Sequence, residues 1–254
     1  ATPETVLPGP GSMDIGNAPV TNFEGGSYDK IDLTTATMKS VNTVFAQIAV
    51  KMGAPALVKQ ANQFGFDTKV PYELPAKISL MPDPAEMTIW ETAWAGVGQP
   101  VGEHDSPAGP QSTVLQMALV ASGIANDGVV MAPYVVGSVR DRVGRDLAGA
   151  RPKAFTTATD PATAQQVTAI MQKVVSGGSG TRAQIDGVVV AGKTGTAEVG
   201  KGQPTNAWFI AFAPADNPTV AMAIMIEGGG IGGQVAAPAA KPVLQAALKA
   251  QKMK

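Results

Sequence analysis

A run of β-branched residues, Val188-Val189-Val190, leads through Ala191-Gly192 into Lys193-Thr194-Gly195-Thr196. Because β-branched side chains favour extended backbone, the run predicts a buried strand over residues 188–195, and the fold must therefore contain a β-sheet. The strand brings a lysine, two hydroxyls and a glycine to one place. With no cysteine and a single histidine in the chain, a thiolate nucleophile and a multi-histidine metal site are excluded. We expect lysine to act as the base if a serine or threonine performs catalysis.

The same stretch also fits the spacing of a phosphate-binding P-loop, because Gly187 and Gly192 precede Lys193-Thr194 as in G-x-x-x-x-G-K-T. A P-loop needs flexible residues between its glycines and a helix directly after them. Here three valines and an alanine fill the loop, and a second glycine and a loop rich in Gly, Lys and Pro follow. These features argue against nucleotide binding.

The charge distribution argues against two further kinds of partner. The 254 residues carry a net charge of −1 with a pI of about 5.9, and lysine and arginine are scattered along the chain. This pattern indicates neither nucleic-acid binding nor a polybasic membrane patch.

His104 is expected in a loop rather than in a metal site, because no partner histidine exists. A chain of this length can bury a substantial core, and we see no boundary that divides it.

Apolar residues recur at helical spacing in several segments, for example at Val44, Phe45, Ile48 and Met52. The predicted helices are residues 34–39, 43–52, 55–64, 111–126, 160–175 and 238–249, with a short helix or turn at Trp90 and Trp94. Residues 1–33 are expected to be loop and turn with short extended pieces. Strands are predicted at 129–141 and 143–147 as a hairpin, and at 188–195, 207–213 and 220–227, of which the last two pair antiparallel. The order of elements predicts an α+β fold with an antiparallel sheet flanked by helices.

Two motifs then point to a known family. Ser40-Val41-Asn42 gives Ser-x-Asn, and Lys193-Thr194-Gly195 follows it about 150 residues later. The flanks Gly96-Val97-Gly98-Gln99 and residues 207–214 also fit. Together these residues resemble the transpeptidase domain of class B penicillin-binding proteins, relatives of the serine β-lactamases, over about residues 12–250. Within that family the chain looks most similar to the actinobacterial penicillin-binding protein A group. The resemblance implies a β-lactamase/transpeptidase-like fold with a largely helical subdomain.

The resemblance implies catalytic roles for three residues. Ser40 would relay or hold the proton near the leaving nitrogen, Asn42 would hydrogen-bond the substrate amide, and Lys193 would place positive charge beside Ser40. The alternatives are structural: Ser40 and Asn42 can both cap a helix start, and Lys193 can be an exposed lysine at a strand end. If the catalytic roles hold, the three side chains should converge on one cleft.

The resemblance also implies a substrate-binding role for the rest of the second motif. Thr194 and Thr196 would offer hydroxyls to the substrate carboxylate, and the amide of Thr196 would form half of an oxyanion hole. Gly195 would let a substrate strand approach the sheet edge, although a β-bulge would also explain a glycine there.

The nucleophile motif of the family, Ser-x-x-Lys, is not credible in this chain. Its early literal match, Ser27-Tyr28-Asp29-Lys30, lies among turn residues only 13 residues before Ser40, and we interpret it as a solvated turn. We therefore expect residues 1–254 to be a transpeptidase domain that lacks its N-terminal portion, with the nucleophile on a segment outside the chain. Without that segment, an apolar face and a sheet edge should lie open.

The resemblance implies a peptidoglycan D,D-transpeptidase that cross-links stem peptides through a serine acyl-enzyme and binds β-lactams. It would act at the extracytoplasmic face of the membrane, anchored by an N-terminal segment, with no cofactor, and with cell-division or elongation proteins as further partners. Two alternatives stay open. One is a non-catalytic substrate- or partner-binding remnant of the same fold, and the other is a related β-lactamase or D,D-carboxypeptidase.

Overall fold

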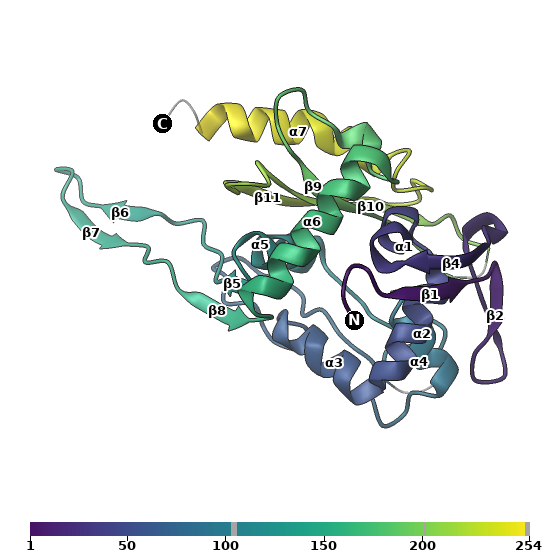
Figure 1. The fold of residues 1–254 in the computed structure, drawn as a ribbon. Helices are drawn as coiled ribbons and strands as arrows, with labels where there is room; N and C mark the ends of the chain where they lie inside the picture. The colour runs from purple at the N-terminus through teal and green to yellow at the C-terminus, as the bar shows by residue number, and fades with distance from the viewer. Residues whose placement is uncertain (103–105, 201, 252–254) are drawn as a thin grey trace.

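A three-stranded antiparallel sheet carries the Lys-Thr-Gly motif through the centre of the molecule (Figure 1). The computed structural model describes residues 1–102, 106–200 and 202–251, so the expectation for His104 lies outside the described residues. The strands β9 (Ala191–Ala197), β10 (Asn206–Ala213) and β11 (Val220–Ile226) pair in the order β11-β10-β9. The antiparallel pairing of β10 with β11 confirms the prediction. The strand predicted over residues 188–195 is displaced, because β9 begins only at Ala191; the three valines precede it, and Val189 is 53% exposed.

The predicted helices are all present, with ends that shift by a few residues. The α-helices are α1 (Leu33–Lys39), α2 (Asn42–Met52), α3 (Ala54–Gln63), α4 (Ile89–Ala95), α5 (Val114–Ala125), α6 (Pro161–Gly177) and α7 (Ala236–Gln251), with 3₁₀ turns η1 (Phe23–Gly25) and η2 (Thr181–Ala183). The Asp160 side chain accepts a hydrogen bond from the Thr163 amide and so caps α6 as its sequence indicates. No helix in the described residues is both long and apolar enough to cross a bilayer.

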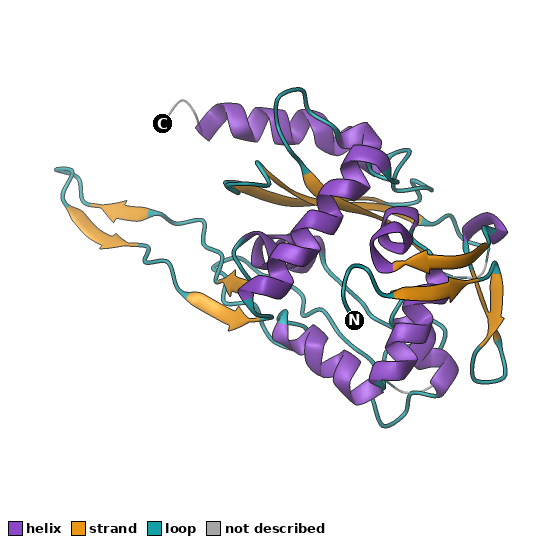
Figure 2. Ribbon diagram, viewed as in Figure 1, coloured by secondary structure: helices purple, strands orange, loops and turns teal. Residues whose placement is uncertain are grey.

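The alternation of side chains along β10 explains the layers on the two sides of the sheet. Ala207, Phe209 and Ala211 are fully buried and pack with residues of α7 on one face. Ile210 and Phe212 point to the other face, where side chains of α5 and α6 cover them. Helices α2, α3 and α4 form a separate helical region below the sheet (Figure 2). The prediction of an α+β fold, with an antiparallel sheet flanked by helices and a helical subdomain, is therefore confirmed.

Over residues 1–33 the expected short extended pieces are confirmed, but the expectation that they remain loop and turn is wrong, because they pair with one another. This segment forms two small antiparallel sheets, in which β1 (Val6–Gly9) pairs with β4 (Tyr28–Asp32) and β2 (Ser12–Asp14) pairs with β3 (Pro19–Thr21). The strands are short and interrupted by turn residues, so their apolar alternation is too brief to predict a strand. Val20 and Ile31 from this segment are nevertheless buried and pack with side chains of α2.

The predicted hairpin around Arg142 is present, but its strands are divided into two separate sheets. Residues 129–141 do not form one strand: β5 (Val129–Met131) pairs with β8 (Ala154–Thr157), and only β6 (Ser138–Arg140) pairs with β7 (Asp146–Gly149). The prolines at 133 and 152 fall between the two sheets, where they remove backbone donors and interrupt the pairing. The β6–β7 ribbon projects away from the rest of the molecule (Figure 1).

Two neighbouring residues of α7 provide a matched test of this core. Leu244 is fully buried against the sheet, whereas Val243 is 50% exposed. We expect Leu244→Ala to lower the free energy of unfolding by about 2–5 kcal/mol, because it leaves a cavity, and Val243→Ala to change it by less than about 0.5 kcal/mol. Urea unfolding of both variants measures the difference. Equal effects would contradict the packing of α7 on the sheet.

Candidate active site

β9 is an edge strand, so one side of its backbone has no strand partner in the described residues. Gly195 lies directly opposite Trp208 in an unbroken register with β10, and the interpretation of Gly195 as a β-bulge is therefore wrong. The strand continues through Thr194 to Ala197, so no helix follows the lysine as a P-loop would require. Backbone groups along this free edge can bind an extended ligand.

Ser40 lies at a sharp turn between α1 and α2. It ends α1 in the left-handed conformation, with φ 56° and ψ 51°, and its amide donates to carbonyls of Ala36 and Thr37. The prediction that Ser40 and Asn42 cap a helix start is wrong: Asn42 is already in the first turn of α2, and its side-chain amide donates to the Thr21 carbonyl at 2.9 Å. The Ser40 hydroxyl is therefore free to face the sheet.

The Lys193 side chain contacts the Ser40 hydroxyl directly, although the two residues lie far apart in the sequence. Its Nζ donates to Ser40 Oγ at 2.6 Å and to the Thr194 carbonyl at 2.8 Å. Burial of the ammonium lowers the pKa of Lys193 from 10.5 to about 8. The predicted convergence of the Ser-x-Asn and Lys-Thr-Gly motifs is thus present, and the alternative of an exposed lysine at a strand end is wrong. At neutral pH the lysine is still mostly protonated, so it can donate a proton toward Ser40.

Both threonine hydroxyls of the motif are held by neighbouring loops. Thr194 Oγ1 lies 2.6 Å from Ser179 Oγ, in the loop after α6, and Thr196 Oγ1 accepts from the Gly232 amide at 3.2 Å. Gly232 packs directly against the strand, since a Cβ there would lie 2.2 Å from the Gly195 carbonyl oxygen. The Gly-rich stretch after β11 therefore allows a close approach that any larger residue would prevent.

Gln99 occupies part of the free edge of β9. Its side-chain amide donates to the Thr196 carbonyl at 3.1 Å, and its carbonyl accepts from the Glu198 amide at 3.0 Å. These bonds show that the Thr196 carbonyl points away from β10, and its amide points the same way because N–H and C=O of one strand residue share a side. The Thr196 amide thus faces the free edge, where an oxyanion hole requires it.

All six predicted site residues line one cavity of about 1110 Å³ between the sheet and α1, α2 and α6. They are Ser40, Asn42, Lys193, Thr194, Gly195 and Thr196. The cavity is mixed in character, because apolar side chains from several elements line it beside the polar motifs. They include Leu33, Phe45, Trp94, Ile124, Val167, Ile170, Met171 and Ile210. Ser27, in contrast, is exposed, precedes β4 and does not line the cavity.

Two polar side chains that hydrogen-bond to β9 were not among the predicted site residues. Ser179 sits in Ser176-Gly177-Gly178-Ser179, which the sequence marks only as the end of a helix. Gln99 belongs to a flank that resembles the family, but its spacing gives no indication of contact with β9 almost a hundred residues later. Only the tertiary fold brings these two side chains to the strand.

Comparison with known proteins agrees with this geometry. The chain matches the family model of the penicillin binding protein transpeptidase domain over residues 3–245. The chain belongs to the penicillin-binding protein transpeptidase family. One relative is the peptidoglycan D,D-transpeptidase PbpA of Mycobacterium tuberculosis, which is 35% identical to the chain. The match covers 98% of this chain and 50% of that protein. The chain therefore spans about half the length of the curated relatives it matches.

Solved structures of this transpeptidase family superpose closely on the chain. The crystal structure of the D,D-transpeptidase domain of a peptidoglycan glycosyltransferase from Eggerthella lenta has a TM-score of 0.94 at 44% identity, covering all of this chain and 62% of that one. Penicillin-binding protein A from M. tuberculosis, as an imipenem acyl-enzyme complex, has a TM-score of 0.84 at 32% identity, covering 98% of this chain and 55% of that one. The similarity to the actinobacterial group is confirmed.

The environment of Lys193 predicts an unusual titration. We expect its side-chain NMR signals, assigned with a Lys193→Arg variant, to titrate near pH 8, whereas exposed lysines titrate above pH 10. The unfolded chain binds more protons than the folded chain between these pKa values, so stability should rise with pH from about 8 to 10.5 relative to Lys193→Met. Titration of Lys193 at the ordinary lysine pKa would show that its ammonium is hydrated.

Proposed function

We propose that the chain forms the substrate-binding and proton-transfer part of a peptidoglycan D,D-transpeptidase that reacts through a serine acyl-enzyme. The 2.6 Å hydrogen bond from Lys193 to Ser40, beside the free edge of β9, is the observation that carries the proposal. Relatives named D,D-transpeptidases, and a relative solved as an imipenem acyl-enzyme, support it. A stem peptide and β-lactams are the proposed ligands, and the proposed location is the extracytoplasmic face of the membrane.

In this proposal the catalytic serine attacks the carbonyl of the penultimate residue of the donor stem peptide. A bond forms between the serine oxygen and the carbonyl carbon, the peptide C–N bond breaks, and the proton that the serine hydroxyl loses ends on the nitrogen of the terminal residue, which leaves as an amine. The Lys193 ammonium donates to Ser40 Oγ, which orients the hydroxyl proton of Ser40 toward that leaving nitrogen. The amine of a second stem peptide then attacks the ester carbonyl, a new C–N bond forms as the ester C–O bond breaks, and a proton from the amine returns to the serine oxygen.

The edge of β9 would bind the reacting peptide. The Thr196 amide would stabilise negative charge on the carbonyl oxygen, with the amide of the catalytic serine as the second donor. The hydroxyls of Thr194 and Thr196 would bind the terminal carboxylate, and the small Gly195 would leave space for the ligand backbone. Asn42 lines the same cavity, where its side-chain amide would hydrogen-bond the peptide further from the reacting carbonyl.

The catalytic serine would lie on a segment outside residues 1–254. The serines that line the cavity are Ser40 and Ser179, and each already shares a hydrogen bond with Lys193 or Thr194. The cavity is large enough and apolar enough to receive a helix, which would place its own serine beside Lys193. The buried Trp94 Nε1–H in the cavity wall has no acceptor among the described residues, and such a segment could supply one.

The sheet offers a second place for the same segment. β11 has no strand partner on its outer edge in the described part of the chain, and all seven of its residues are apolar and half-buried. An unpaired apolar edge promotes association, and an additional strand would satisfy its backbone donors and acceptors. We therefore propose that residues 1–254 are one portion of a transpeptidase domain, completed by a strand and a helix. Proteins of the division or elongation machinery are the proposed further partners.

Intact-mass spectrometry tests where the acyl-enzyme forms. After incubation with benzylpenicillin, the full-length protein should gain the mass of one drug molecule, and peptide mapping should locate it on a serine outside residues 1–254. The isolated chain 1–254 should gain none. An adduct on Ser27 or Ser40 would place the nucleophile within this chain, and the absence of any adduct on the full-length protein would favour a non-catalytic remnant.

Substitution of the polar pair tests the proposed proton transfer. In the full-length protein, Ser40→Gly and Lys193→Ala should each lower the second-order rate of penicillin acylation by about 10²- to 10⁴-fold. Glycine at residue 40 removes the hydroxyl but tolerates the left-handed backbone, so the fold is preserved. Lys51→Ala, on the exposed side of α2, is the matched control and should leave the rate unchanged. Unchanged acylation in both site variants would refute the role of the pair.

A further inference from the structure

The β6–β7 ribbon has no structural support from a third strand. We call residues 132–153, which contain β6 and β7, the arm. β6 and β7 pair only with each other in the part of the chain that the structure describes. An isolated two-stranded ribbon is marginally stable in water, and a third strand or a covering element is normally required. The arm projects from the molecule without such a cover (Figure 1).

The backbone of the arm has open hydrogen-bonding edges. In an antiparallel pair, alternate residues point their N–H and C=O groups away from the partner strand. At the base of the arm, before β6 begins, the Val135 amide donates to Glu73 Oε2 at 3.2 Å. Hydrogen bonds from backbone amides, first its own and then those of Val135 and Val136, lower the pKa of Glu73. Backbone amides at the base of the arm therefore already bind a carboxylate.

Large apolar side chains concentrate on the arm. Of the sixteen large hydrophobic residues that are exposed among the described residues, six lie between residues 134 and 147. They are Tyr134, Val135, Val136, Val139, Val143 and Leu147, with exposed fractions from 44% to 75%. Such a concentration on one projecting element is typical of an interaction surface rather than of scattered surface residues.

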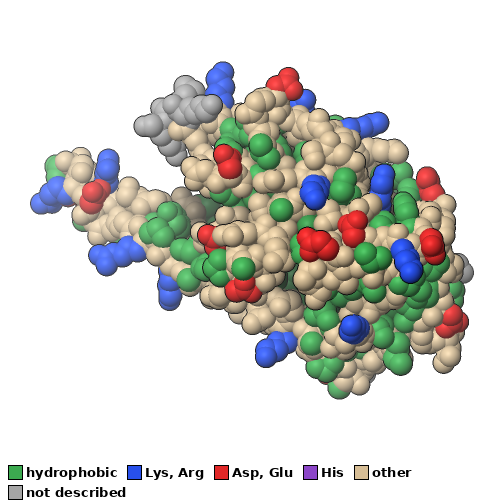
Figure 3. Space-filling view, viewed as in Figure 1, with side chains coloured by type: hydrophobic (Ala, Val, Ile, Leu, Met, Phe, Trp, Pro, Cys, Tyr) green, Lys and Arg blue, Asp and Glu red, His purple; other side chains and the backbone are tan. Residues whose placement is uncertain are grey.

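The arm is also basic in an otherwise slightly acidic chain. Five basic and two acidic side chains give residues 132–153 a net charge of +3, whereas the whole chain carries −1. Both aspartates are used within the arm, in the ion pairs Arg140–Asp146 and Arg145–Asp141. The remaining cations, Arg142, Arg151 and Lys153, make no ion pair with a described residue. Lys and Arg side chains gather along the arm in Figure 3.

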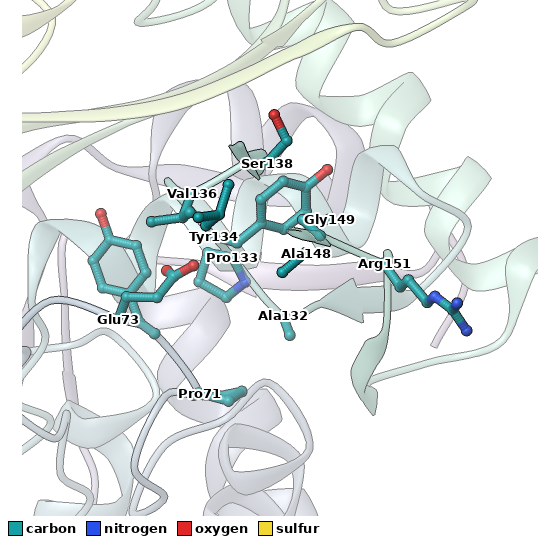
Figure 4. Close-up of a pocket in the computed structure, with 13 residues that line it drawn as sticks. Pro71, Glu73, Ala132, Pro133, Tyr134, Val136, Ser138, Ala148, Gly149 and Arg151 are labelled. Atoms are coloured by element: carbon teal, nitrogen blue, oxygen red, sulfur yellow. The ribbon is translucent and has the colours of Figure 1, made fainter. Parts of the chain in front are cut away.

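A hollow of about 470 Å³ lies at the base of the arm, between the arm and residues 71–73. Tyr72, Tyr134 and Val136 contribute to its apolar wall, and Arg151 lines it from the strand side. The Arg151 guanidinium points away from Glu73 (Figure 4). The hollow can therefore receive an apolar side chain while a carboxylate of the same ligand binds Arg151.

We propose that the arm is the docking site for an extended, acidic segment of a partner protein, which adds as a third strand to the β6–β7 ribbon. The open edges supply main-chain hydrogen bonds, and the exposed valines and the hollow receive alternate apolar side chains. The unpaired cations select acidic residues between them. This function is separate from acyl transfer, because the arm contributes no residue to the cavity of Ser40 and Lys193.

A labelled peptide can test this docking on the full-length protein. The probe is a fluorescein-labelled peptide of alternating glutamate and valine, with a lysine–valine peptide as the charge control. Fluorescence anisotropy should show binding of the acidic peptide alone, weakened by about 0.5 M NaCl because salt screens exposed charges. Amide hydrogen exchange should slow in Ser138–Arg140 or Asp146–Gly149 when the acidic peptide binds.

A charge-reversed variant provides the matched comparison. Arg142→Glu/Arg151→Glu should weaken binding by about tenfold or more. Lys30→Glu/Lys51→Glu, which changes net charge equally at exposed positions outside the arm, should have little effect. Equal losses in both variants, binding without slower exchange in the ribbon, or binding of the lysine–valine peptide would each overturn the proposal. Binding of phosphatidylglycerol vesicles but not of the acidic peptide would overturn it in favour of a membrane contact.

Discussion

The hydrogen bond between Lys193 and Ser40 connects the two halves of the site. It joins residues 153 positions apart, one on the central sheet and one at the turn between two helices. Burial of the ammonium disfavours its charged form and lowers the pKa of Lys193 to about 8. The Ser40 oxygen and the Thr194 carbonyl offset part of this cost by accepting hydrogen bonds. If the helices and the sheet moved apart, that ammonium would lose its hydrogen bond to Ser40.

Position on an edge strand gives this pair access to a ligand. β9 pairs on one side with β10, and its other side faces the cavity, where Gln99 already bonds to the strand. The close approach of Gly232 holds the Gly-rich stretch against β9 and positions its amide at the Thr196 hydroxyl. A lysine, a free backbone edge and fixed hydroxyls thus line one cavity.

Much of the fold could be predicted from the sequence, because apolar periodicity and end signals determine the helices and the strands of the central sheet. The convergence of Ser40 with Lys193 could also be predicted, but only through the resemblance to a family. The left-handed turn at Ser40 could not, since serine carries no strong preference for it. The contacts of Gln99 and Ser179 depend on tertiary packing, and the short strands before residue 33 have too little alternation to detect.

The central claim is that Ser40, Lys193 and the edge of β9 surround a serine supplied from outside residues 1–254. A crystal structure of the full-length protein acylated by benzylpenicillin tests it most directly. We expect the acylated serine in the cavity, within hydrogen-bond or one-water reach of Lys193 Nζ and Ser40 Oγ, with the ester carbonyl oxygen on the Thr196 amide. An acylated serine elsewhere, with the cavity still open beside Lys193, would contradict the account.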